Sequence, residues 1–190
     1  MHLSRTTKTL LLGANIWYFG EGMLGPLLAI FTEKIGGDIL DITGAWASFL
    51  IVTGLVYILV GKLVNGRPYK AKVMVAGYAL NALFTFCYIF VSNTWQLFFV
   101  QAGLGIAEAM GTPTWDALYA KNVDSTNDTY AWGLASGQSQ IVTGIAIIGG
   151  GLIANYLSFN VLFFIMGCIQ VIATIIQAQI LLYKTESSSI

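Results

Sequence analysis

Two acidic residues, Glu21 and Glu108, stand near the middle of long apolar stretches of this chain. Each opens the same short pattern of an acid, a small residue, a methionine and, three positions further, a proline, at residues 21–26 (EGMLGP) and 108–113 (EAMGTP). A carboxylate at the centre of a bilayer costs roughly 3 kcal/mol or more, so acids in such positions call for a functional explanation. The chemistry open to them is the binding of a proton or of a cationic group.

The composition indicates that these acids are carried by membrane-spanning helices. The chain has 190 residues, of which 56% are hydrophobic and 9% charged, and its mean hydropathy of +0.74 is outside the range of ordinary soluble domains. A helix crosses about 30 Å of hydrocarbon with about 20 residues. We therefore predict an all-α membrane protein, one domain over 1–190, with six transmembrane helices at 10–31, 42–63, 72–91, 94–117, 130–155 and 161–183.

The placement of Lys and Arg predicts the orientation. Basic residues near the ends of spans are retained in the cytoplasm. With the N-terminus inside, Lys34 is outside and every other basic residue is cytoplasmic: Arg5, Lys8, Lys62, Arg67, Lys70, Lys72, Lys121 and Lys184. Both termini are thus expected in the cytoplasm, in a multi-pass protein of a prokaryotic plasma (inner) membrane. The first span is too long for a cleaved signal peptide, and no nucleic-acid partner is expected.

The second half of the chain repeats features of the first. Besides the pattern at 21–26 and 108–113, a Thr-Gly pair followed by a spaced glycine and an asparagine occurs at 53–65 and again at 143–155. The two copies extend over about 9–91 and 94–183. Three spans in each copy force opposite orientations, so the sequence predicts a 3+3 inverted repeat, which is typical of secondary transporters. Chance similarity among glycine-rich apolar helices is the alternative.

Helical periodicity places the polar side chains of the 94–117 segment on one stripe. Its members are separated by four or three residues: Gln101, Gly105, Glu108, Thr112 and Trp115. Contact with lipid does not explain a stripe that contains an amide, a carboxyl group and a hydroxyl group. We therefore expect this face to line a polar cavity.

The 10–31 segment carries a comparable face. Trp17, Tyr18 and Glu21 lie within one helical turn. Pro26 and Pro113 each remove a backbone donor close to an acid, so both helices are expected to break or bend there. A structural role, in which a neutral glutamic acid bonds a carbonyl freed by the proline, is the alternative to proton or cation binding. No Lys or Arg lies in mid-span to pair with either acid.

Small residues mark a further face on the 42–63 and 130–155 segments. Small residues at helical spacing let two helices approach closely. The glycines that form this predicted subunit interface are Gly54, Gly61, Gly133, Gly137, Gly144 and Gly151. Packing inside a single bundle would use the same pattern and stays open as the alternative.

Residues 61–70 (GKLVNGRPYK) resemble the signature loop of the major facilitator superfamily, a glycine followed four residues later by an acid and then by a basic cluster. Asn65 stands in place of the acid and Pro68 in place of a usual glycine. Gln101 stands where the fourth helix of the family commonly has an arginine. Asp116 is similar to the family's acid that partners the basic loop. The resemblance thus implies a cytoplasmic latch made by Asn65, Arg67, Lys70 and Asp116.

The resemblance also implies roles for the polar faces, because helices 1 and 4 of each half line the central cavity in this family. It assigns proton coupling to Glu21 and Glu108, and substrate binding to Trp17, Tyr18, Gln101, Thr112 and Trp115. The family normally has twelve spans in two such halves, and this chain resembles the N-terminal one. Alternating access needs two halves, so a homodimer is expected. An excised half of a longer transporter is the alternative.

The sequence therefore favours a secondary active transporter of a small organic solute, coupled to protons, with H⁺, the solute and the bilayer as partners. A membrane scaffold or assembly protein would explain the glycines but not the polar stripe. An intramembrane enzyme ranks lowest, because Ser136, Ser139 and the acids have no recognised catalytic spacing. With His2 as the sole histidine and no Walker-type loop, no enzyme activity, cofactor or metal is expected.

Overall fold

The computed structural model describes residues 4–123 and 128–186, with side chains described to residue 183. His2 lies outside these residues. The described part is helical, with one short 3₁₀ helix, η1. The elements in chain order are α1 (Arg5–Gly22), α2 (Leu27–Lys34), α3 (Ile39–Val64), α4 (Lys70–Cys87), η1 (Tyr88–Phe90), α5 (Thr94–Lys121), α6 (Asp128–Tyr156) and α7 (Phe159–Glu186).

Local capping signals fix where several helices begin. The Ser4 side chain accepts a hydrogen bond from the Thr7 amide at the start of α1. Asp38 and Asp41 form a capping box at the start of α3, and Asn93 caps α5. These side chains satisfy backbone donors that have no partner inside the helix. The helices therefore begin at positions that the sequence itself specifies.

The first predicted span is broken in two. α1 ends at Gly22 and α2 begins at Leu27, and Pro26 stands in the intervening turn, which is closed by a bond from the Leu27 amide to the Leu24 carbonyl. The inner face of α6 lies on this break, because a Cβ atom at Gly150 would overlap the Met23 carbonyl.

α5 does not break at Pro113, because the helix continues through this residue, and the alternative of a bend there stays a prediction. The Thr114 hydroxyl donates to the carbonyls of Met110 and Gly111, at 2.5 and 2.8 Å, and holds the turn around the proline. Hydroxyl side chains commonly re-satisfy backbone groups beside a proline in this way.

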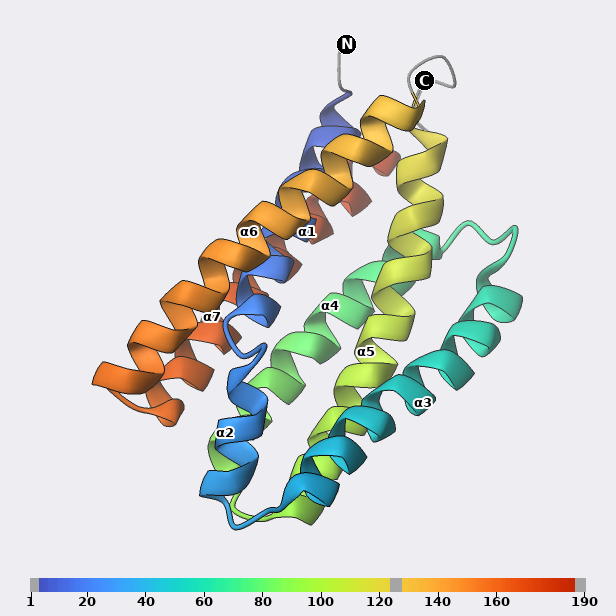
Figure 1. Cartoon of the computed structure of the whole chain (residues 1–190). Coiled ribbons are helices and arrows are strands. Elements are labelled where there is room, and N and C mark those ends of the chain that lie inside the picture. Colours follow the sequence, from blue (N-terminus) through green and yellow to red (C-terminus); the bar gives the residue numbers. More distant parts are fainter. Residues whose placement is uncertain (1–3, 124–127, 187–190) are drawn as a thin grey trace.

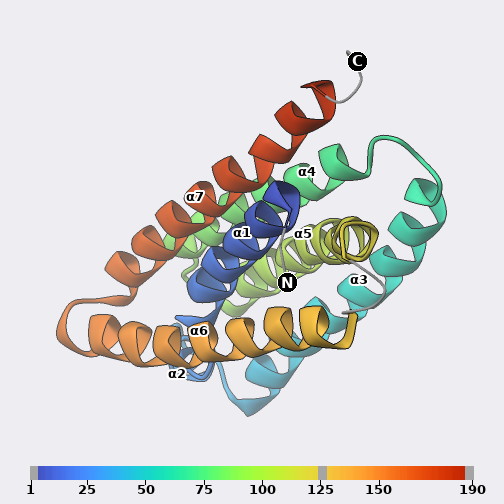
Figure 2. The ribbon, with the colours of Figure 1, turned by 90° about the horizontal axis from the view of Figure 1, so that it is seen from above.

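The helices form two groups that meet along α4 and α7 (Figure 2). α5 packs between α3 and α4, and α1 packs between α6 and α7. α1 and α2 in series run from one end of the bundle to the other, and the later helices alternate in direction (Figure 1). As a result, α1 begins and α7 ends at the same end of the bundle.

Within the described residues, four segments are long and apolar enough to cross a membrane: Ile39–Val64, Lys70–Phe90, Asp128–Tyr156 and Phe159–Tyr183. The other two predicted spans correspond to α1 with α2, and to α5. α1 carries Arg5, Lys8 and Glu21, and the polar stripe of α5 lowers its hydropathy. The count of six spans therefore stays a prediction, whereas the all-helical membrane fold is confirmed. α3 and α6 bury less of their apolar length than α4 and α7 do, so they are the outer helices.

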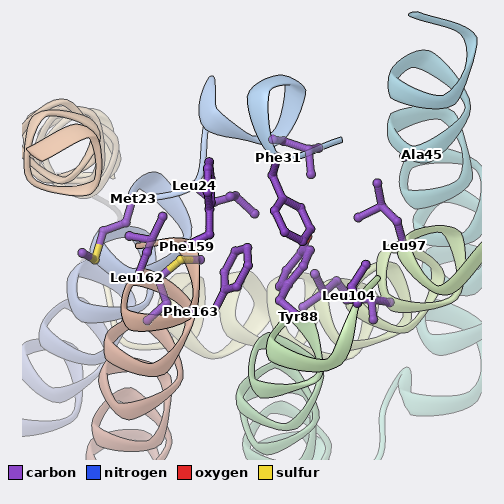
Figure 3. Close-up of a cluster of buried hydrophobic side chains, with 14 of the residues drawn as sticks. Met23, Leu24, Phe31, Ala45, Tyr88, Leu97, Leu104, Phe159, Leu162 and Phe163 are labelled. Carbon is purple, nitrogen blue, oxygen red and sulfur yellow. The ribbon is translucent and has the colours of Figure 1, made fainter. Parts of the chain in front are cut away.

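Two hydrophobic clusters fill the bundle. The first surrounds α2, η1 and the start of α7, where the rings of Phe31, Tyr88 and Phe163 face one another (Figure 3). The second joins the start of α1 to the ends of α5 and α7, around Leu10 and Tyr119. Glu21, Asn81 and Glu108 belong to neither cluster and lie between the two along their helices, in a region that we call the polar layer.

Candidate functional site

Both sequence-predicted acids lie in this polar layer. Along α1, Trp17 belongs to one cluster and Met23 to the other, and Glu21 falls between them. Along α5, Leu104 and Trp115 belong to different clusters, with Glu108 between them. Both carboxyl groups therefore lie between the two apolar clusters, away from either end of the bundle.

Glu21 lies on the wall of a cavity of about 240 Å³. Its Oε1 atom accepts a hydrogen bond of 2.9 Å from Nδ2 of Asn81 on α4, a residue that is 1% exposed. The cavity is bounded by α1, α2, α3, α5 and α6, together with η1; its polar lining is Tyr18, Glu21, Tyr88, Gln101 and Thr143. Glu21 is thus anchored on one side and open to the cavity on the other.

Glu108 has a more closed setting. The Tyr57 hydroxyl of α3 donates to its Oε1 atom at 3.0 Å, and the Thr112 hydroxyl, one turn later on α5, donates to the same atom at 2.8 Å. The residues that line the cavity beside Glu21 do not include Glu108. The structure therefore gives the two acids different surroundings although their sequence contexts match.

Aromatic side chains surround the space between α1 and α5. The Trp17 ring packs on Tyr78 and Tyr18, with centroids 4.8 and 5.7 Å apart. The buried indole N–H of Trp17 makes no regular hydrogen bond among the described residues, but it lies close enough to the carboxyl group of Glu21 to interact with it. Trp115 instead donates its N–H to the Leu10 carbonyl at 3.0 Å. The N–H group of Trp17 therefore faces the acid, whereas that of Trp115 ties α5 to α1.

Tyr18 links the first cavity to two smaller ones. A cavity of about 20 Å³ is lined by Tyr18, Thr112, Trp115 and Asp116, and one of about 110 Å³ opens toward Trp132 and the serines of α6. The structure thus distributes the predicted substrate-binding residues over adjacent spaces. Among the described residues, no Lys or Arg lines any of these three cavities, and the charged residues on their walls are Glu21 and Asp116.

Among the predicted latch residues, Asp116 lies apart from the other three. Asp116 faces α1 and α6 through the two smaller cavities. Lys70 lines one cavity with Asn65 and a groove at the end of the bundle with Arg67, and Asp116 lines neither. The latch stays a prediction that needs another arrangement of these residues.

The glycines of the predicted interface face open space, and Gly61 among them lines a cavity with residues of α4 and α5. A Cβ atom at any of them would meet no atom within 4 Å: Gly54, Gly61, Gly133, Gly137, Gly144 and Gly151. Other glycines serve packing inside the bundle, such as Gly77 of α4 against the backbone of α5 and Gly105 of α5 against α3. Internal packing therefore does not account for the six glycines of the predicted interface.

The sequence interpretation missed the partners of the two acids. Asn81 and Tyr57 are polar residues in the middle of their helices, and this was the available signal. It did not reveal which acid each would contact, because both bonds join different helices.

Comparison with known protein families identifies the family of this chain. The profile described as Major Facilitator Superfamily matches residues 10–189. The chain belongs to the Major Facilitator Superfamily. It is accordingly an integral membrane protein of a transporter family.

Two relatives show what share of a longer family member's length this chain covers. It is 26% identical over 159 residues to an uncharacterized MFS-type transporter of Methanocaldococcus jannaschii, a match that covers 83% of this chain and 40% of the relative. Its fold matches the in meso crystal structure of the POT family transporter PepTSo with a TM-score of 0.74 at 12% identity, covering 93% of this chain and 37% of that one. The chain thus spans less than half the length of both.

Proposed function

We propose that this chain forms one half of a proton-coupled secondary transporter of a small organic solute, which works by alternating access. The observation that carries the proposal is the setting of Glu21, a carboxyl group on the wall of a cavity to which no described basic residue contributes. An acid without a basic partner is suited to bind a proton or a cationic group. Ionisable residues inside membranes commonly mark such pathways.

The packing of the helices supports the proposed inverted repeat. α5 lies between α3 and α4 in the same way as α1 lies between α6 and α7. If each of the first three spans is matched with the corresponding one of the last three, the group of α3, α4 and α5 maps onto the group of α6, α7 and α1. The α1–α5 space would then be the centre of the repeat, where transporters of this kind bind substrate.

The two acids have different parts in this proposal. Glu21 is the group that takes up and releases the proton, because it is open to the cavity and Asn81 fixes one of its oxygens. The N–H group of Trp17, one turn earlier, is a donor that the carboxylate or the substrate can engage. Glu108 contributes after its bonds to Tyr57 and Thr112 open.

The cavity walls suggest the class of substrate. Aromatic rings, hydroxyl groups and one amide surround this space, and Glu21 is the one charged side chain among the described residues that line it. Aromatic faces and carboxylates both attract cations. We therefore expect a neutral polar solute or an organic cation rather than an anion.

The second half is proposed to be another copy of this chain. The glycines of α3 and α6 that face open space offer a surface on which helices can approach closely, and a C2 dimer would supply a complete pair of halves. Gly137→Leu and Gly144→Leu should weaken association without unfolding the bundle. Mass measurement in nanodiscs tests this, and a transport-active single copy would contradict the dimer.

Uptake into proteoliposomes under an imposed pH gradient tests the function. One pH unit can drive about tenfold accumulation with one coupled proton. The wild-type protein should concentrate a neutral or cationic solute, and Glu21→Gln should abolish this accumulation because it keeps the shape and removes the titration. Glu33→Gln, at an exposed glutamate of α2, is the matched control.

Two outcomes would count against the proposal. Proton-driven accumulation by the Glu21→Gln, Glu108→Gln double variant would assign both acids a structural role. The absence of any uptake or exchange across a panel of sugars, amino acids and organic cations would favour a scaffold.

A further inference from the structure

A groove of about 600 Å³ opens at the end of the bundle where α1 begins and α7 ends. It lies far along α5 from the polar layer and shares no lining residue with the cavity beside Glu21. Parts of α1, the α3–α4 loop, α4, α5 and α7 surround it. Its polar and charged lining consists of Thr6, Arg67, Lys70, Lys121, Asn122 and Tyr183.

The groove concentrates positive charge. Arg67, Lys70 and Lys121 come from three different elements, and none of the described residues that line the groove is acidic. None of the three has a carboxylate within ion-pairing distance among the described residues. The guanidinium of Arg5 lies 4.3 Å from the ring centre of Tyr183, so a fourth cation stands beside the groove. The positive-inside rule accounts for basic residues at this end of the bundle, but it does not require them to converge on one space.

The start of α4 adds to this positive potential. The N-terminus of a helix carries a partial positive charge, which acidic side chains or bound anions normally offset. α4 has no acid in its first turn, and its N-cap residue Tyr69 makes no side-chain capping bond. Lys70 and Lys72 instead add two cations where the helix dipole disfavours them. A bound anion would offset this positive charge.

The floor of the groove is apolar. It is formed by Ala71, Ala117, Leu118 and Ile180, beneath the charged rim. A free inorganic anion would gain nothing from contact with this apolar surface. A phospholipid, in contrast, carries a charged phosphate group next to its hydrocarbon chains. The groove also lies at the ends of helices, where headgroups meet water, and basic pockets between helices are known to bind anionic headgroups.

We propose that this groove binds the phosphate group of an anionic phospholipid, with the first part of an acyl chain on the apolar floor. Arg67, Lys70 and Lys121 contact the phosphate. The site is a lipid site separate from the solute cavity.

Native mass spectrometry of the delipidated protein tests the proposal. The probes are dioleoyl phosphatidylglycerol, which is anionic, dioleoyl phosphatidylcholine, which is zwitterionic, and sodium phosphate. The wild-type protein should bind one phosphatidylglycerol at least tenfold more tightly than phosphatidylcholine. Lys70→Gln, Lys121→Gln should weaken phosphatidylglycerol binding roughly 30-fold, at about fivefold for each removed charge. The matched control is Lys8→Gln, Lys62→Gln, which removes two exposed lysines of the same end that do not line the groove.

Three results would overturn the assignment. Equal affinity for the two lipids would show that headgroup charge is irrelevant, and equal losses in both double variants would show unspecific attraction. Displacement of phosphatidylglycerol by low millimolar phosphate would assign the groove to a soluble anion. If Lys70→Gln, Lys121→Gln does not fold, the comparison of the three probes on the wild-type protein still decides, and Lys70→Arg, Lys121→Arg should retain binding.

Discussion

Replacing Gly77 by alanine should push α4 and α5 apart. A Cβ atom at this position would lie 2.6 Å from the Gly111 nitrogen and 2.8 Å from the Ala107 oxygen. Both are backbone atoms inside a helix and cannot rotate away. An ordinary contact begins at 3.4 Å, so the two helices must separate locally by about 0.8 Å, the difference between 3.4 and 2.6 Å.

Such overpacking typically costs 1–3 kcal/mol of unfolding free energy, and we expect about 2 kcal/mol because the obstacle is backbone. This corresponds to a roughly 30-fold change in the unfolding equilibrium constant. Gly149→Ala on α6 is the matched control, since its Cβ would meet no atom within 4 Å and it is outside the predicted subunit interface. It should change the stability by no more than about 0.5 kcal/mol.

Unfolding in mixed micelles with increasing sodium dodecyl sulfate, followed by tryptophan fluorescence, measures both variants. Gly77→Ala should unfold at a clearly lower mole fraction of the denaturing detergent than the wild type and Gly149→Ala. Coincident transitions for the two variants would refute the close α4–α5 contact.

Three further predictions concern single contacts. Gln177→Leu removes the bonds to the Leu10 carbonyl and the Tyr78 hydroxyl and should lower stability by about 0.6–2 kcal/mol in the same unfolding assay, unlike Gln140→Leu at an exposed position of α6. Asn81→Leu leaves Glu21 without its donor and should lower proton-driven accumulation roughly tenfold, while solute exchange without a gradient persists; unchanged accumulation would separate Asn81 from the coupling step. Arg67→Gln should keep the topology but change the labelling rate of a cysteine introduced at Thr143 in the cavity, because a latch to Asp116 requires a second conformation in which they meet; an unchanged rate would remove the latch.

Much of the fold could be predicted from hydrophobic length and turn chemistry. The predicted spans 42–63, 130–155 and 161–183 lie within α3, α6 and α7, because long apolar runs with polar ends leave little choice of structure in a bilayer. The equal sequence patterns at Pro26 and Pro113 led to different structures. The outcome at Pro113 depends on the bonds of the Thr114 hydroxyl to nearby carbonyls, which helical spacing alone does not reveal.

The site could be predicted only in part. Helical spacing placed Gln101, Glu108 and Thr112 on one stripe, and the structure joins Glu108 to Thr112 by a hydrogen bond. The same stripe is then divided, because Gln101 faces the cavity with Glu21 while Glu108 is closed off by Tyr57. Periodicity assigns a side chain to a face of its own helix, but the neighbouring helix decides whether that face is open or covered.

The break between α1 and α2 gives α6 a mechanical role. On its inner side, Gly150 rests on the Met23 carbonyl, just beyond Glu21, and Gly22 packs on Thr143 of the same helix. On its outer side, Gly144 faces away from the bundle with nothing beside it. A neighbour docked there would be only about one helix diameter, roughly 10 Å, from the turn that sets the position of the acid. A small tilt of α6 would then displace the Glu21 carboxyl group, because a single layer of contacts separates this helix from the turn beside the acid.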